Sequence, residues 1–89
     1  ISPASRRAAN KACSAMAELL SRAYAALGQR TEQHRTQAEV YYLRGSLPAA
    51  IEQLEIARRA SDGDFYTLSA VDARLRELKQ RLLEEKRER

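Results

Sequence analysis

Hydrophobic residues along this 89-residue chain recur every three or four positions, in stretches that are separated by three glycines. Such spacing marks one face of an α-helix, and a glycine after it supplies the left-handed residue that commonly ends a helix. Gly28, Gly45 and Gly63 follow one another at nearly equal intervals, each long enough for one helix and a tight turn. The pattern therefore predicts four antiparallel helices, at about residues 5–27, 31–44, 47–60 and 65–86.

The residues at the expected helix starts agree with this division. Thr31, Ser46 and Asp64 each carry a side-chain oxygen that can accept a hydrogen bond from the free N–H groups of a first turn. Pro48 falls in the first turn of the third helix, where its missing N–H costs nothing.

Composition favours an all-α fold in a single small domain. Sixteen Ala and eleven Leu stand against five Val and Ile together, and the first two residue types favour helices while the β-branched ones favour strands. No apolar run approaches the ~20 residues that a membrane-spanning helix needs. The chain begins with Ile1 instead of Met, which leads us to expect a piece of a longer protein.

Two consecutive helices with their turns come to about 34 residues, the period of tetratricopeptide (TPR) repeats. We therefore expect a TPR-like right-handed superhelical stack, whose best single repeat covers residues 31–64. In a second frame, Leu20, Ala23, Tyr24 and Leu27 end the first helix of a repeat, and the two frames stay open. The positions at which a repeat beginning at Thr31 places its helix crossing and its turn are Ala38, Tyr41, Gly45, Ala50, Leu54 and Ala57.

The residues available for chemistry are few. A single histidine, His34, excludes a histidine-based metal cluster, and a single cysteine, Cys13, excludes an internal disulfide. We expect His34 to be a partly buried packing residue and Cys13 to be a small buried hydrophobe. The chain is therefore expected to hold no catalytic residue, metal or cofactor.

The net charge of +4 raises the question of nucleic-acid binding. A nucleic-acid binder concentrates its basic residues on one face, whereas here they are scattered over all four helices among acidic ones. Glu77 and Arg81, for example, stand four apart in the order that favours an ion pair along a helix. We expect no nucleic-acid partner, and a basic nucleic-acid binder is kept as a third alternative.

Several motifs resemble a known family: Ala38–Gly45 (AEVYYLRG), Ala50–Glu55 (AIEQLE), Asp64–Tyr66 (DFY) and Asp72–Leu78 (DARLREL). They are similar to the C-terminal TPR domain of BepA/YfgC-like periplasmic zinc metallopeptidases, over about residues 20–83. The resemblance implies a periplasmic domain that follows a zinc protease domain, handles outer-membrane proteins and contacts the outer-membrane assembly machinery. The His-Glu-x-x-His motif of that protease is absent from these 89 residues, so zinc and catalysis are expected only in the parent protein.

Two surfaces are candidates for protein binding. In the repeat frame, one stripe of the second helix faces the concave side, where TPR arrays hold protein or peptide segments. Its residues are Glu32, Arg35, Glu39 and Tyr42. The last helix carries Leu68, Val71, Leu75, Leu78 and Leu82 at alternating steps of three and four, a seam expected to pack inward along its first half.

The expected function is accordingly a non-catalytic TPR-type protein-interaction module. The alternative is a self-associating helical bundle, that is, a homodimer formed through the last helix. Its contacts, which could equally serve an upstream domain, would be Leu78, Leu82 and Leu83.

Overall fold

The computed structural model describes residues 3–60 and 62–88, and over these ranges it contains four α-helices and no strand. They are α1 (Pro3–Ala26), α2 (Arg30–Leu43), α3 (Leu47–Arg59) and α4 (Phe65–Glu88). The expected all-α fold of four helices is confirmed, and the boundaries lie within two residues of those expected from the sequence.

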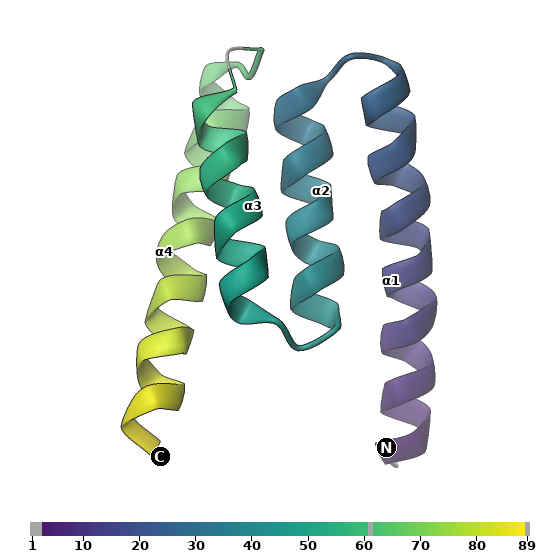
Figure 1. Cartoon of the computed structure of the whole chain (residues 1–89), viewed down its shortest axis with the longest axis vertical. Coiled ribbons are helices and arrows are strands. Elements are labelled where there is room, and N and C mark those ends of the chain that lie inside the picture. Colours follow the sequence, from purple (N-terminus) through teal and green to yellow (C-terminus); the bar gives the residue numbers. More distant parts are fainter. Residues whose placement is uncertain (1–2, 61, 89) are drawn as a thin grey trace.

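Each helix packs against the next one along the chain. Figure 1 shows α1, α2 and α3 side by side in a row, with α4 lying across α3 at the far edge and reaching α2 only slightly. α1 and α4 extend past the α2–α3 turn at the same end of the molecule. This arrangement is a helical bundle in which, as far as residues 3–60 and 62–88 are concerned, α1 packs against α2 and against no other helix.

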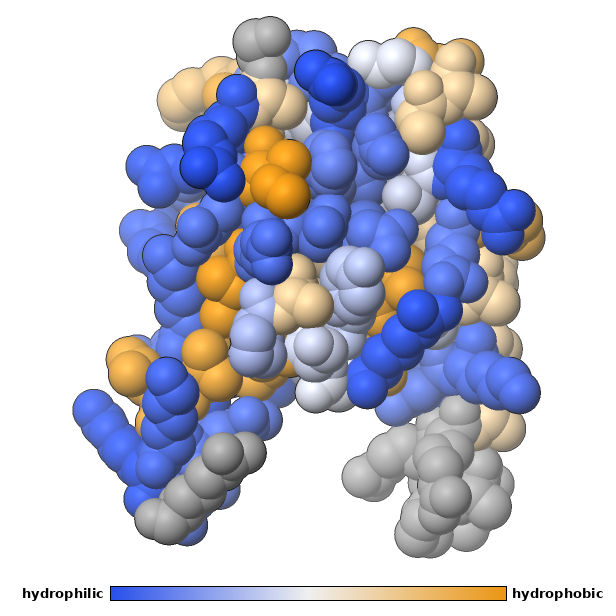
Figure 2. All heavy atoms as spheres, viewed as in Figure 1, coloured by the Kyte–Doolittle hydropathy of each residue, from blue (hydrophilic) through white to orange (hydrophobic). Residues whose placement is uncertain are grey.

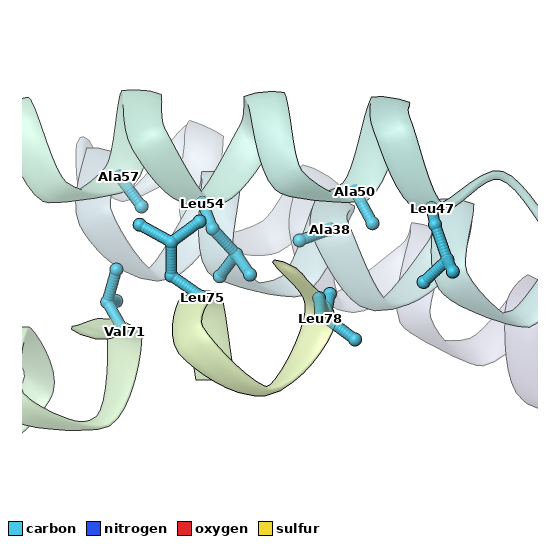
Figure 3. Packing of buried hydrophobic residues seen from close by; sticks show 8 residues of the cluster. All are labelled: Ala38, Leu47, Ala50, Leu54, Ala57, Val71, Leu75 and Leu78. Atoms are coloured by element: carbon cyan, nitrogen blue, oxygen red, sulfur yellow. The ribbon is translucent and has the colours of Figure 1, made fainter. Parts of the chain in front are cut away.

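The hydrophobic core lies between α2, α3 and α4, and Figure 3 shows its side chains pointing toward one another. Small residues form much of this core: Ala38, Ala50 and Ala57 are fully buried, beside a fully buried Leu54. These are positions that the repeat pattern assigned to the helix crossing. The α4 seam also packs inward, through Val71, Leu75 and Leu78, and Leu82 packs against the core farther along α4 than expected.

Two of the three glycines end helices as predicted. Gly28 has φ +74° and Gly45 has φ +85°, a backbone conformation that side chains with a Cβ disfavour. Gly63 does not adopt this conformation, so the prediction that it supplies a left-handed residue is wrong. A Cβ at Gly63 would lie 2.9 Å from the Oγ1 of Thr31, so glycine permits the close approach of this turn to α2.

The start of α2 is capped by a residue from a distant part of the chain. The carboxylate of Asp62 accepts hydrogen bonds from the backbone N–H of Arg30 at 2.5 Å, the N–H of Thr31 at 3.0 Å and the hydroxyl of Thr31 at 2.7 Å. Thr31 is therefore not the N-cap that its sequence position indicated; Gln29 holds that place without a side-chain bond. The turn before α4 thereby fastens the far end of α3 to the first turn of α2.

The caps of the two later helices differ. The Asp64 carboxylate accepts from the N–H of Thr67 at 2.7 Å, which confirms its predicted role. Ser46 occupies the N-cap position of α3 but makes no side-chain capping bond there. Pro48 lies in the first turn of α3, as expected.

The Asp62 cap leads to a pH-dependent prediction. The hydrogen bond from the Thr31 hydroxyl, followed by those from the backbone, lowers the pKa of Asp62 below its ordinary value. The stabilisation by the Asp62 carboxylate is therefore fully present above the pKa that Asp62 has in the unfolded chain, about 3.9. It is lost as the pH falls through the lower pKa that Asp62 has in the folded chain. We expect Asp62→Asn to lower the Tm at pH 7 and the difference from wild type to shrink below pH 4.

Thermal melts followed by circular dichroism at pH 7, 5, 4 and 3 measure this difference. Asp72→Asn is the matched control, because Asp72 makes only an exposed ion pair with Arg58 at 3.2 Å. A constant difference between Asp62→Asn and wild type across this range would contradict the role of the Asp62 charge.

Candidate protein-binding surface

The helix α1 has two unlike sides. Ser14 and Ser21, which are seven residues apart and so on one side of the helix, are buried against the rest of the molecule. The hydroxyl of Ser21 donates to the backbone carbonyl of Gln33 on α2 at 3.2 Å, whereas the Oγ of Ser14 has no hydrogen-bond partner. The buried residues of α1 are therefore small and polar.

The opposite side of α1 is apolar and faces outward. Met16 is 71% exposed, Leu19 62% and Leu20 49%, and Leu27, the first residue after α1, is 70% exposed. Apolar colour accordingly appears along the outer edge of α1 in Figure 2. An amphipathic helix normally turns its apolar stripe toward the core, so the orientation of α1 is the reverse of the usual one.

Cys13 shares this outward orientation. It is exposed, so the expectation of a small buried hydrophobe is wrong. The reason is that Cys13 lies away from Ser14 and Ser21 around the helix, on the side that no other helix covers.

An open groove of about 720 Å³ runs between α1 and α2, beside the outward apolar residues. Three of the four stripe residues expected to bind protein line its α2 side, namely Glu32, Arg35 and Glu39. Its α1 side is formed mainly by apolar residues: Met16, Ala17, Leu19, Leu20, Ala23 and Tyr24. The groove thus has one apolar wall and one charged wall.

The charged wall is organised by ion pairs. Arg35 pairs with Glu32 at 3.2 Å within α2. Glu39 accepts two hydrogen bonds from the guanidinium of Arg74 on α4, at 2.8 and 3.0 Å. This bidentate pair, more than any other contact, raises the pKa of Arg74 above its ordinary value. Glu39 therefore ties α2 to α4 as well as lining the groove.

Tyr42, the fourth residue of the predicted stripe, lies elsewhere. Its ring is covered by the guanidinium of Arg74 at 4.6 Å and approached by that of Arg81 at 5.6 Å. It lines a separate depression of about 470 Å³ together with Arg81 and Asn10. The structure therefore brings Glu32, Arg35 and Glu39 together but places Tyr42 in a contact with α4.

The second predicted surface, on the last helix, is largely occupied by the core. Leu78 is fully buried, so it cannot contact a second chain while the domain is folded. Leu82 is half-buried and packs against the core, and Leu83 alone is exposed, at 51%. These residues do not form a continuous apolar surface.

The remaining chemistry is sparse in the described part of the chain. His34 is half-buried, and its Nδ1–H donates to the side-chain oxygen of Gln53 at 2.8 Å, as expected for a packing histidine. Over the described residues, no group of three or more His, Cys, Asp or Glu side chains is placed to hold a metal ion. Within the same residues, no helix has the length and hydropathy needed to cross a membrane.

Comparisons with models of protein families, with curated proteins and with solved structures find no match to this chain. The resemblance to BepA/YfgC-like metallopeptidases is therefore one of sequence motifs, in residues 20–83.

The apolar surface of α1 was not among the candidate sites drawn from the sequence. A signal for it was present, since Ser14 and Ser21 lie opposite Met16, Ala23 and Leu27 around a helix of 3.6 residues per turn. What the sequence could not supply was which of the two sides contacts α2.

Proposed function

We propose that this chain is a non-catalytic protein-interaction module that binds its partner along the outward side of α1 and the adjoining α1–α2 groove. The observation that supports this most directly is the contiguous exposure of Met16, Leu19, Leu20 and Leu27. Contiguous apolar patches on soluble domains mark protein or membrane interaction sites, groove-shaped ligand sites or aggregation-prone surfaces. The length of the patch along one helix favours a protein segment.

The distribution of charge supports a protein partner over nucleic acid. The arginines nearest the groove are committed to acidic side chains, Arg35 to Glu32 and Arg74 to Glu39. Arg44, near the other side of α1, pairs with Glu18. A nucleic-acid site needs a stripe of uncompensated positive charge, whereas this groove combines one apolar wall with paired charges.

The same proposal extends to the type of repeat and to the parent protein. We propose that the stack is TPR-like, with α2 and α3 as one repeat, and that the module belongs to a periplasmic metallopeptidase-like protein that acts on outer-membrane proteins. Burial of Ala38, Ala50, Leu54 and Ala57 supports the repeat. The parent relation depends on the motif resemblance, and the sequence of the parent gene tests it by the presence of His-Glu-x-x-His upstream of these residues.

Site-specific photo-crosslinking tests the surface itself. A benzoylphenylalanine in place of Leu20 is expected to form covalent protein adducts in cells that express the chain, because position 20 lies on α1 and lines the groove. The same group in place of Arg22, which is exposed on the same helix but outside the groove, is the matched control and is expected to give none. Equal adducts at the two positions, or none at position 20, would contradict the proposed surface.

A further inference from the structure

We propose that the partner of this surface is a second copy of the chain, with the two α1 helices packed antiparallel on each other across a two-fold axis. This inference rests on the proposed function and names its partner. A two-fold interface requires one patch to be complementary to itself, and the outward side of α1 meets that requirement in spacing, charge and size.

The spacing is that of a helix–helix seam. Steps of four and three residues alternate along the outward side of α1, the repeat with which two helices pack knobs into holes. All six residues of this seam are exposed, so nothing in the described chain covers it. They are Ala9, Cys13, Met16, Leu20 and Ala23 on α1, and Leu27, which directly follows the helix and donates its N–H to the carbonyl of Ala23.

The charges near the seam permit a like partner. None of the six seam residues is charged, and Leu19 widens the apolar surface beside them. The acidic residue in the middle of α1, Glu18, points toward α2 and pairs with Arg44. Lys11 and Arg22 lie on one flank of the helix, away from the seam. A second α1 therefore meets no repulsion within the seam.

The antiparallel direction is favoured because it pairs large side chains at one end of the seam with small ones at the other. With the axis at the middle of the seam, Cys13 faces Ala23 of the other copy and Met16 faces Leu20. The largest exposed end residue, Leu27, then meets the small Ala9. A parallel pair would instead place Leu27 against Leu27 and leave small residues facing each other at Ala9, Cys13 and Ala23. Opposed helix dipoles also favour the antiparallel pair.

The surface reaches the lower limit of area for a specific interface. Covering the exposed parts of Met16, Leu19, Leu20 and Leu27 on both copies removes roughly 1,000 Å² from water, the area at which specific interfaces begin. The exposed apolar surface at the end of α4 consists of Leu83, because Leu78 is buried and Leu82 packs against the core. Self-association is thus assigned to α1 and not to the Leu78–Leu83 end of the last helix.

The molecular mass in solution tests the pairing. Sedimentation equilibrium at about 100 μM is expected to give twice the 10.1 kDa of the chain. Leu20→Glu and, separately, Met16→Glu are each expected to halve this mass while the helical circular dichroism is retained, because both side chains lie outside the core. Leu83→Glu, a change of the same kind at an exposed site on α4, is the control and is expected to leave the dimer intact.

A cysteine pair tests the direction of the helices. In the wild-type dimer the two Cys13 residues lie roughly 15 Å apart along the helix axis, too far for a disulfide. Ala23→Cys places a second thiol opposite Cys13 of the other copy, so mild oxidation is expected to give a covalent dimer. Cys13→Ser combined with Ala23→Cys is expected to give none. A disulfide-linked dimer of the wild-type chain through Cys13 would overturn the antiparallel pairing.

The outcomes separate this inference from the proposed function. If the wild-type chain is monomeric and position 20 still crosslinks to a different protein in cells, the pairing with a second copy is wrong. The proposed interaction surface on α1 is then retained. A monomeric chain with no adduct at position 20 overturns both. If Leu20→Glu leaves the mass of the dimer unchanged and Leu83→Glu halves it, the chain self-associates through α4 and not through α1.

Discussion

Replacing Leu54 with alanine is expected to lower the free energy of unfolding by about 2–5 kcal/mol, the cost of removing a buried leucine side chain and leaving a cavity. Leu54 is among the largest fully buried side chains, and Figure 3 shows it on α3 pointing into the core toward Leu75 on α4. Small domains are stable by about 5–15 kcal/mol. The substitution therefore removes a large part of the total stability.

Urea denaturation followed by circular dichroism measures this loss. Leu83→Ala is the matched control, since it makes the same change at a leucine that is 51% exposed on α4. We expect the control to change the free energy of unfolding by about 0.5 kcal/mol or less. Equal losses for the two variants would mean that the α2–α3–α4 core does not dominate the stability.

Local signals explain why the helices could be predicted. Gly28 and Gly45 end their helices through a backbone conformation that depends on the residue itself, and Asp64 caps α4 through an N–H three residues away. Such features are determined within a few residues of sequence. The burial of Ala38, Ala50 and Ala57 followed in the same way from a repeat pattern of fixed spacing.

Contacts between distant residues explain what the sequence missed at the start of α2. The cap comes from Asp62, some thirty residues later, and Gly63 is needed there because Thr31 lies against it. No local pattern distinguishes these residues from an ordinary turn. The same holds for Tyr42, whose place is decided by Arg74 on α4.

The outward orientation of the apolar side of α1 could not be predicted from the sequence. Hydrophobic periodicity shows that a helix has an apolar side, but it does not show what covers that side. On α1 the buried residues are Ser14 and Ser21, whereas Met16, Leu19 and Leu20 are exposed. The candidate site is consequently not the predicted stripe on α2 but a surface formed mainly by α1, with Glu32, Arg35 and Glu39 at its edge.

Overpacking the α3–α4 contact is expected to have the second large effect on stability. Ala57 is fully buried, and Figure 3 shows it on α3 directly facing Val71 on α4. Leucine at this position adds three heavy atoms where the two helices already touch, so that side chains must leave their preferred rotamers or the helices must move apart. Such insertions into a packed core cost about 1–3 kcal/mol.

The control for Ala57→Leu is Ala73→Leu, because Ala73 is exposed on α4 and leucine is nearly as good a helix former as alanine. Thermal and urea melts of the two variants then separate overpacking from any general effect of adding a leucine. We expect Ala57→Leu to melt well below wild type and Ala73→Leu to melt close to it. If Ala57→Leu melts like wild type, α3 and α4 have room for a larger side chain at this position. The small residues that the repeat frame assigns to this crossing would then need another explanation.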